Sequence, residues 1–450
     1  MSAPDLVVIG GGIAGLTVAR DAAAAGMSVT VVERHNDVGG MLRGAPLGEV
    51  SVDIGAESFA TRTSGVVDLI EDADLHLETV APSPGGAHLA ARDGERTILA
   101  PLPGRAVLGI PGEPEAADVI RILGVAAAER VAAEREYGPL RGPEPTLAEL
   151  IARRCGDVLL TRLVDPLCRS VFSRPASDAF LSQVHPALWR AFERTGSLVR
   201  AAAEIAPTTR TGSAVGGIAG GMWQLAAATA GAAENAGATI RTGTTVQGIT
   251  SAGGRVSVHL PGEQIDAARV VLATGAHAAH ALVGEEPPPA AAGVRVVAAL
   301  VESSELDAHP VGSGVIVAPD VEGLAKALTH ASAKWAWLSD ALGPGRHVLR
   351  ISLRDADAAV ERAALAAELS RLTGTTITPE QVAATTDARW EEATTAGTIS
   401  PEAAQAWSRR GIVVTGAAVA GTGLATVIPH ARAVAASLLH ATTPIDGIRS

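Results

Sequence analysis

The first 34 residues of the chain constrain its fold more than any other part. Residues 6–9 (LVVI) are apolar throughout, as in a short buried strand, and residues 28–33 (SVTVVE) alternate into a second strand. Residues 13–25 lie between them, are rich in alanine and end before Gly26, as a helix does. Strands joined by a crossover helix pair in parallel. We therefore expect an α/β fold that opens with a βαβ unit.

The turn between the first strand and the helix is Gly-Gly-Gly-Ile-Ala-Gly, a G-x-G-x-x-G sequence. The first glycine permits the tight turn, the second lets the backbone approach a pyrophosphate, and the third lets helix and strand pack closely. The N–H groups at the start of the helix then face the phosphates. The sequence predicts a dinucleotide site whose phosphate-binding residues are Gly10, Gly12, Ile13, Ala14 and Gly15.

An acidic residue closes the second strand of this unit. Glu33 stands where a carboxylate can accept hydrogen bonds from both ribose hydroxyls, and it disfavours a 2′-phosphate. We include its neighbour Arg34 in the predicted cofactor site. The alternative is a glycine-rich turn of an ordinary α/β protein, which the complete strand–turn–helix–strand context argues against.

A second glycine pair follows and distinguishes between dinucleotides. Residues 38–43 (VGGMLR) resemble the GG-x-x-R element of the amine oxidase-like flavoproteins. By that resemblance, Gly39, Gly40 and Arg43 lie beside the flavin end of FAD. A loop that carries a solvated arginine is the alternative reading.

Residues 52–62 (VDIGAESFATR) resemble a more specific element, D-x-G-x-E-S-F-x-x-R, of the FAD- and oxygen-dependent porphyrinogen oxidases. Within that family, the actinobacterial coproporphyrinogen III oxidase type is the most similar. Further stretches keep the family's order along nearly the whole chain: 103–111, 163–172, 220–225, 242–246, 331–335 and 416–424.

The resemblance implies FAD as cofactor and a flavin-driven reaction without a catalytic side chain. The residues that it assigns to FAD beyond the first loops are Gly55, Ala56, Glu57, Ser58, Val246, Trp390, Gly416, Thr422, Gly423 and Leu424. The implied substrate is coproporphyrinogen III, which loses six electrons to oxygen with release of H2O2 in haem biosynthesis. Its propionates need cations, for which the candidates are Arg62, Arg174 and Lys334.

Other functions stay open at this point. Protoporphyrinogen IX is an alternative substrate, and another FAD oxidase, a desaturase or a non-catalytic flavin- or tetrapyrrole-binding protein is an alternative class. One departure from the family motivates the last of these: residues 391–401 (EEATTAGTISP) lack the family's tyrosine and histidine. The chain also departs at Gly275, where the family usually has proline, and at Ser173-Arg174, which replaces its Ala-Gly.

Composition excludes several other functions. A formal charge of −12 and an aromatic content of 2% argue against a nucleic-acid partner. Two cysteines and no ligand-like histidine spacing argue against a disulfide framework or a metal site. No signal peptide is visible, and glycines interrupt the uncharged segments 214–233 and 411–429, so we expect a cytoplasmic protein without membrane spans. Peripheral membrane contact and a partner enzyme of the haem pathway stay compatible with the sequence.

The fold class that follows is α/β, with a discontinuous Rossmann-type FAD domain of the amine oxidase and p-hydroxybenzoate hydroxylase type, a helical insert and an α+β substrate domain. The FAD domain is expected over residues 1–90, 210–276 and 408–440. The helical insert is expected over 105–205, and the substrate domain over 277–407 with about 91–104.

Overall fold

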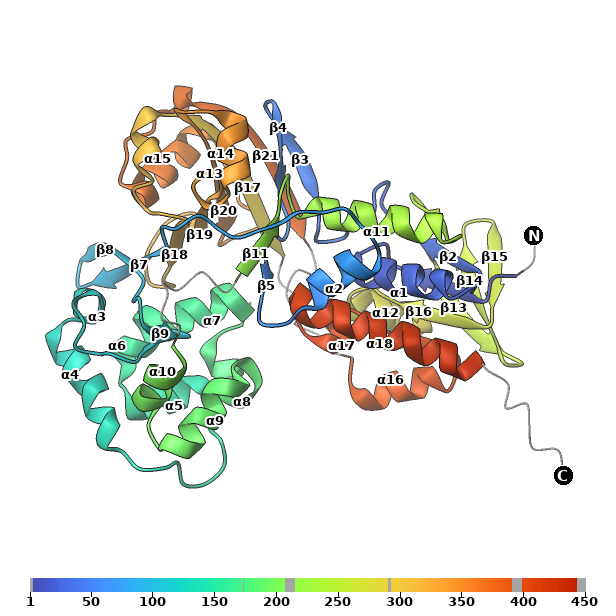
Figure 1. Cartoon of the computed structure of the whole chain (residues 1–450), viewed down its shortest axis with the longest axis horizontal. Coiled ribbons are helices and arrows are strands. Elements are labelled where there is room, and N and C mark those ends of the chain that lie inside the picture. Colours follow the sequence, from blue (N-terminus) through green and yellow to red (C-terminus); the bar gives the residue numbers. More distant parts are fainter. Residues whose placement is uncertain (1–2, 173, 207–214, 290–292, 391–398, 443–450) are drawn as a thin grey trace.

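The computed structural model describes residues 3–172, 174–206, 215–289, 293–390 and 399–442. Figure 1 shows three regions: a parallel sheet between helices at the right, a larger sheet at the upper left, and a group of helices at the lower left. The α/β class predicted from the opening βαβ unit is confirmed.

A five-stranded parallel sheet forms the first region. Its strands in spatial order are β12 (Thr239–Arg241), β2 (Val29–Val32), β1 (Leu6–Ile9), β16 (Arg269–Leu272) and β22 (Ile412–Val414). One face packs on α1 (Ile13–Ala24), α11 (Trp223–Asn235) and α18 (Leu424–Thr442). The other face packs on the antiparallel strands β13 (Gly248–Ala252), β14 (Arg255–Leu260) and β15 (Glu263–Ala267), and on α12 (Ala276–Val283) and α16 (Pro401–Ser408). Burial on both faces explains why the strands β1 and β22 are apolar throughout.

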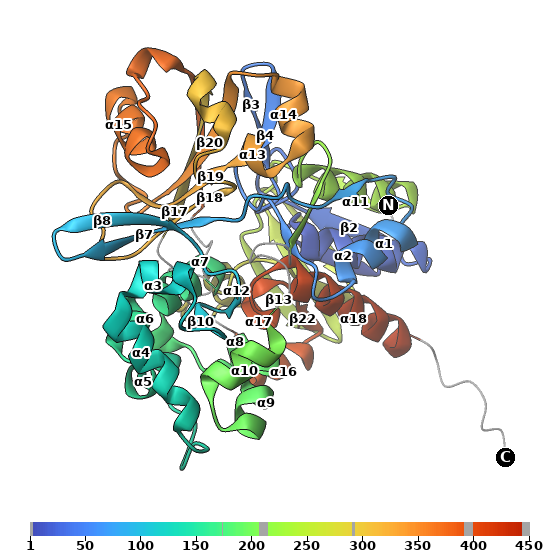
Figure 2. The ribbon, with the colours of Figure 1, turned by 60° about the vertical axis from the view of Figure 1, so that its left-hand side comes forward.

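A seven-stranded sheet forms the second region. Its spatial order is β21 (Val382–Trp390), β17 (Val294–Glu302), β20 (Arg346–Leu353), β19 (Ala325–His330), β18 (Gly314–Val317), β7 (His88–Asp93) and β8 (Arg96–Pro101). The hairpin β3 (Gly44–Leu47) and β4 (Val50–Asp53) packs on one face together with α13 (Ala331–Lys334) and α14 (Ala336–Leu342). Figure 2 shows this hairpin beside α13 and α14, at the junction of the two sheets.

The third region is helical, as predicted for residues 147–205. It contains α3 (Ala117–Leu123), α4 (Val125–Ala133), α5 (Leu147–Arg154), α6 (Asp157–Leu159), α7 (Asp165–Phe172), α8 (Leu181–Val184), α9 (Pro186–Thr195) and α10 (Leu198–Ile205). These helices share one apolar core with α15 (Arg362–Thr373) and with the second face of the seven-stranded sheet.

Short elements connect the three regions. They are β5 (Phe59–Ala60), α2 (Gly65–Asp72), β6 (Thr79–Val80), β9 (Ala106–Val107), β10 (Ile110–Pro111), β11 (Val215–Ile218) and α17 (Ala417–Ala420). The predicted domain boundaries stay a prediction. Two helices of the expected substrate domain, α12 and α16, pack on the five-stranded sheet.

Local hydrogen bonds influence how two helices begin. Helix α15 begins only at Arg362, after a turn in which the Asp355 carboxylate accepts a hydrogen bond from the Asp357 amide (2.8 Å). Helix α18 begins at Leu424, five residues before Pro429. Pro429 cannot donate to the carbonyl of Ala425, and the Thr63 hydroxyl donates to that carbonyl instead (3.1 Å).

Within the described residues, no helix combines the length and apolarity that a bilayer span requires.

Candidate active site

The glycine turn after β1 is packed as its sequence demands. A Cβ on Gly15 would lie 2.0 Å from the carbonyl oxygen of Gly10, so only glycine lets α1 approach the turn. Gly10 has a φ of +109° and lies against the backbone of Ala273. The N-terminus of α1, which contains Ile13 and Ala14, has no side-chain cap and no acidic residue in its first turn. Its amides can therefore bind an anion from outside the chain.

Glu33 lies at the end of β2, beside this turn. Its side chain is buried, and one carboxylate oxygen accepts a hydrogen bond from the Gly11 amide (2.7 Å) while the other accepts from the His35 amide (2.9 Å). The turn after β12 is anchored here as well, because the Thr244 amide donates to the Glu33 carbonyl (2.8 Å). Half-buried Val246 follows in the same turn. Arg34, by contrast, is exposed.

The second glycine pair rests directly on the first turn. Gly39 pairs with Gly12 in an isolated parallel bridge, and its amide donates to the Gly11 carbonyl (2.8 Å). A Cβ on Gly40 would lie 3.2 Å from the Cα of Gly12. Side chains at these positions would push the two loops apart, which explains the glycines without reference to any ligand.

The loop after β4 continues this stack. The Ala56 amide donates to the carbonyl of Met41 (2.8 Å), and a Cβ on Gly55 would lie 1.9 Å from the same oxygen. Trp390 reaches the loop from β21, where its indole N–H donates to the Ile54 carbonyl (3.2 Å). The guanidinium of Arg43 lies 5.5 Å from the centre of that indole ring. Predicted cofactor residues from three parts of the chain therefore meet here.

Glu57 of the same loop lies between two cations. Its carboxylate is 2.8 Å from Lys334 Nζ and is also paired with Arg350, while Thr329 Oγ1 lies 3.4 Å away. Burial alone would raise the pKa of Glu57, but the charges of Lys334 and Arg350 lower it to about 2. Lys334, which we expected to bind a propionate, thus already has a carboxylate partner within the chain.

Sequence reasoning missed two residues near this loop, Arg350 and Asp53. Arg350 interrupts the apolar strand β20, and a charge in the middle of an apolar run is a signal that could have indicated it. Asp53 ends β4 and accepts hydrogen bonds from the amides of Met222 (2.9 Å) and Trp223 (3.0 Å) at the start of α11. Burial raises the pKa of Asp53 to about 6, despite these two hydrogen bonds.

The C-terminal glycine turn completes the arrangement. A Cβ on Gly416 would lie 3.6 Å from that of Ala14, which places this turn at the start of α1. Thr422 is half-buried and its carbonyl accepts from the Thr426 hydroxyl (3.1 Å). Gly423 has a φ of +99° and leads into Leu424, the first residue of α18.

The remaining candidates are more dispersed. Arg62 is exposed and has no acidic partner among the described residues. Burial lowers the pKa of His185, and the nearby positive charge of Arg62 lowers it further. Arg174 is half-buried, and Ser58 is half-buried in the loop after β4. The segment 391–398, which carries most of the atypical stretch, and Ser173 lie outside the described residues.

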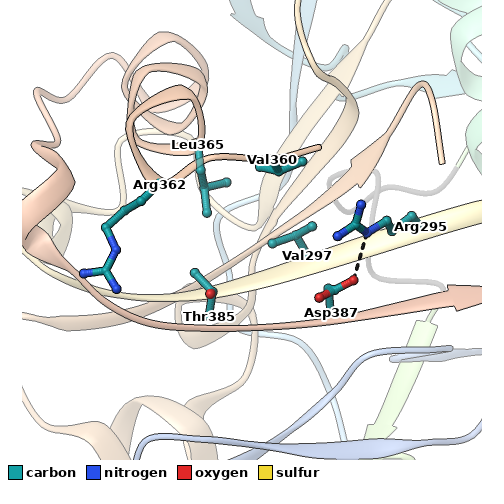
Figure 3. Close-up of a pocket in the computed structure, with 7 residues that line it drawn as sticks. All are labelled: Arg295, Val297, Val360, Arg362, Leu365, Thr385 and Asp387. Atoms are coloured by element: carbon teal, nitrogen blue, oxygen red, sulfur yellow. Dashed lines mark hydrogen bonds and ion pairs between the residues drawn. The ribbon is translucent and has the colours of Figure 1, made fainter. Parts of the chain in front are cut away.

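A small cavity of about 80 Å³ lies elsewhere, between β17, β21 and α15. Figure 3 shows Arg295 paired with Asp387 at its edge, with Val297 and Thr385 beside them. Side chains alternate between the faces of a sheet, so these odd-numbered positions face away from Trp390. The cavity is therefore on the opposite face of the sheet from the loop that carries Glu57.

Across the described residues, no cluster of three metal-ligating side chains is present.

The stacked loops fit a dinucleotide cofactor. The first turn of α1 has no side-chain cap, and a Cβ on Gly12 would meet only the Cα of Gly40, at 3.9 Å, so the backbone faces open space here. Glu33 stands beside the same turn, where a ribose hydroxyl can reach it. Arg43, Trp390 and the loop 55–58 continue the stacked loops from this turn to strand β21 of the seven-stranded sheet.

Comparisons with known proteins agree with this geometry. The family of flavin-containing amine oxidoreductases matches residues 13–312. A coproporphyrinogen III oxidase of Mycobacterium tuberculosis is 30% identical over 344 residues, which cover 74% of each chain. A coproporphyrinogen III oxidase of Mycobacterium leprae is 32% identical over 227 residues, or 49% of each chain.

Solved structures agree with the fold. A protein of Exiguobacterium sp. 255-15, provisionally named protoporphyrinogen oxidase, has a TM-score of 0.83 at 22% identity and covers 98% of this chain and 100% of its own. The cyclohexylamine oxidase of Brevibacterium oxydans has a TM-score of 0.63 at 16% identity, over 98% and 99% of the two chains. The predicted flavoprotein family and its FAD cofactor are confirmed, and the chain belongs to the family of flavin-containing amine oxidoreductases.

Proposed function

We propose that this protein oxidises coproporphyrinogen III to coproporphyrin III in cytoplasmic haem biosynthesis. One observation carries the proposal: the relative that is 30% identical over 74% of both chains is named for this activity. The substrate loses six electrons and six protons, and three molecules of O2 become three of H2O2. The FAD cofactor supplies the redox chemistry, since it accepts electrons two at a time and is reoxidised by oxygen.

The chain's own residues then bind and orient. The stacked glycine loops and Glu33 hold the dinucleotide, and the loop 55–58 with Arg43 and Trp390 borders its flavin end. Arg62, exposed and without an acidic partner among the described residues, is available for a propionate, and Arg174 is a second candidate. The porphyrinogen would then bind between the parallel sheet and the seven-stranded sheet, over the flavin and away from bulk water.

The test uses purified, FAD-loaded protein and anaerobically prepared porphyrinogens. With coproporphyrinogen III we expect porphyrin fluorescence to rise while one O2 is consumed and one H2O2 is formed for every two electrons removed. The same protein stripped of FAD is the control. A flavin-loaded protein that leaves every porphyrinogen unchanged contradicts the proposal and favours a non-catalytic relative.

Protoporphyrinogen IX is the second candidate substrate. A chloroplastic protoporphyrinogen oxidase 1 of Arabidopsis thaliana is 25% identical over 199 residues, which is 43% of this chain and 35% of its own. The two substrates differ in their number of propionates, four against two, so cations at the cavity rim favour the first. A larger kcat/KM for protoporphyrinogen IX, measured side by side, would reverse the assignment.

A further inference from the structure

The Glu57 carboxylate is bound from both sides by side chains of the seven-stranded sheet region. Lys334 Nζ lies 2.8 Å from one oxygen, and an Arg350 guanidinium nitrogen is paired with the other. Thr329 and Arg350 are directly opposite on β19 and β20, which is why both side chains reach the same carboxylate. We call Glu57, Lys334 and Arg350 the Glu57 triad.

The Glu57 triad is largely shielded from water. The side chains of Glu57, Lys334 and Arg350 are 16%, 13% and 8% exposed. Ion pairs in such surroundings are screened little, and removal of one partner leaves an uncompensated charge in a poorly solvated place. The Glu57 triad is therefore expected to matter far more than a surface ion pair.

Backbone contacts connect the Glu57 triad to the dinucleotide turn. Arg350 Nη2 donates to the Gly55 carbonyl (2.8 Å), and the next amide, that of Ala56, donates to Met41 (2.8 Å). The loop that contains Met41 rests in turn on Gly12 through Gly39. Arg350 thus fixes both the side chain and the backbone of a loop that forms one wall of the cofactor cradle.

We propose that Lys334 and Arg350 are positioning residues for FAD: through Glu57 they hold the loop Gly55–Ser58 in the place where it borders the flavin. Lys334 is then not a propionate ligand, and the Glu57 carboxylate contributes to FAD binding only through the loop that it anchors. The proposal depends on FAD binding and not on which porphyrinogen, if any, is oxidised. Its failure can therefore be told from failure of the proposed function.

The first test measures FAD affinity of the apoprotein by quenching of flavin fluorescence. Arg350→Met removes the pairing with Glu57 and with the Gly55 carbonyl, and we expect FAD to bind about 10- to 100-fold more weakly, as for loss of hydrogen bonds to a charged group. Arg350→Lys keeps the positive charge but cannot contact Glu57 and the Gly55 carbonyl through two separate nitrogens. It should therefore bind FAD more weakly than the wild type and more tightly than Arg350→Met.

A matched control is available at the end of the same strand. Arg354 donates to the carbonyls of Ala318 (2.9 Å) and Val321 (2.8 Å), far from Glu57 in the hydrogen-bond network. Arg354→Met should lower stability yet leave FAD affinity unchanged. If it weakens FAD binding as much as Arg350→Met does, the effect is one of general destabilisation and the proposal fails.

Two further variants keep the proposal testable if Arg350→Met does not fold. Glu57→Gln preserves shape and removes the charge, and Lys334→Met removes the other cation; each should weaken FAD binding. The double variant Glu57→Gln/Lys334→Met should bind FAD no more weakly than Glu57→Gln alone, because the Lys334 ammonium acts on the loop through Glu57. Lys334→Met with normal FAD affinity but a raised KM for coproporphyrinogen III would make Lys334 a substrate residue and overturn the inference.

Discussion

Gly12 and Gly15 belong to the same turn, but a side chain would meet different surroundings at each. At Gly15 a Cβ would lie 2.0 Å from the Gly10 carbonyl oxygen, whereas at Gly12 the nearest atom is the Gly40 Cα at 3.9 Å. Gly12 also has an ordinary φ of −75°. Gly15 is therefore required by the fold, whereas the fold leaves room for a side chain at Gly12, which we propose is a glycine because of the cofactor.

We expect Gly12→Ala to fold with nearly unchanged stability and to lose FAD affinity by more than about tenfold, because the methyl group would occupy space where the pyrophosphate approaches. Gly15→Ala should instead lower the free energy of unfolding by about 1–3 kcal/mol, because the backbone must move. Urea unfolding of the apoproteins and FAD titration separate the two effects. Equal loss of stability in both variants would contradict this division.

Arg62 is the best-placed candidate for substrate recognition. If it binds a propionate, Arg62→Ala should raise the KM for coproporphyrinogen III about tenfold or more, in line with the loss of a charge-assisted hydrogen bond. FAD affinity should not change, because Arg62 makes no contact with the stacked loops. Steady-state kinetics with Arg62→Lys as the conservative control checks the result, and an unchanged KM would exclude Arg62 from the site.

Asp53 gives a pH dependence of stability with a defined sign. Its pKa is about 6 in the folded protein and 3.8 as the ordinary value, so the folded state favours the protonated acid. The stabilisation is complete below pH 4 and is lost as the pH rises through 6. A shift of this size corresponds to about 3 kcal/mol. Glu57 has the opposite sign, since its stabilisation is present above pH 4.5 and is lost as the pH falls toward 2.

Asp53→Asn should therefore remove a downward slope of stability between pH 4 and 6. The variant is expected to be less stable overall, since the Met222 and Trp223 amides donate to different oxygens of Asp53 and an asparagine replaces one of these oxygens with an NH2 donor. The informative quantity is the difference in unfolding free energy between wild type and variant, measured by urea at several pH values. A difference that is constant from pH 4 to pH 7 would contradict the assignment.

At the scale of elements, one buried carboxylate organises the helical region. Glu134 follows α4 and accepts from Arg154 Nε (2.7 Å), the Ser197 hydroxyl (2.6 Å) and the amides of Leu198 (2.9 Å) and Val199 (3.0 Å). It thereby joins the end of α5 to the first turn of α10, where a negative charge is also favoured by the helix dipole.

Glu134→Ala should lower the stability of the helical region by about 3–5 kcal/mol, because it leaves the Arg154 guanidinium buried and unpaired. Hydrogen exchange should show faster opening of α5 and α10. The parallel sheet, which shares no hydrogen bond with Glu134, should keep its protection. Uniform loss of protection across the chain would indicate that the three regions unfold as one unit.

Sequence patterns predicted some elements far better than others. Strand β1 was evident because both of its faces are buried, which makes the run wholly apolar, and strand β2 departs from this only at the half-buried Thr30. Strand β21 (VAATTDARW) was missed because it lies at the sheet edge and is largely exposed, so its composition resembles that of a loop. The hairpin β3–β4 was missed for the related reason that its strands are short and contain Pro46.

The site was predictable to the extent that backbone geometry required glycine. The loops at Gly15, Gly39 and Gly55 could be identified because close approach of other backbone atoms leaves no other residue type. The Glu57 triad could not, because a sequence shows that Lys334 is charged but not that Glu57 already neutralises it. Long-range pairing between residues of different elements is set by tertiary packing alone.

At the scale of the whole molecule, FAD should stabilise the fold because the loops that we propose to hold it come from parts of the chain as far apart as Gly12 and Gly416. At a free concentration one hundred times its dissociation constant, a ligand that binds only the folded state adds about 2.7 kcal/mol to the free energy of unfolding. We expect that increase on adding FAD to the apoprotein, and an increase smaller by about 1.3 kcal/mol or more at the same concentration for Gly12→Ala, because its affinity is lower by tenfold or more. A stabilisation that Gly12→Ala shares in full would point to binding at another place.

The strand order of the parallel sheet also has a consequence for biosynthesis. Strand β1 leaves the ribosome well before its neighbour β16, residues 269–272, and the edge strand β22, residues 412–414. Helix α1 likewise waits for the turn at Gly416 that packs on Ala14. A nascent chain must therefore carry an open β1 edge until residues 269–272 have been synthesised, and the cofactor loops can come together only after Gly416 has followed.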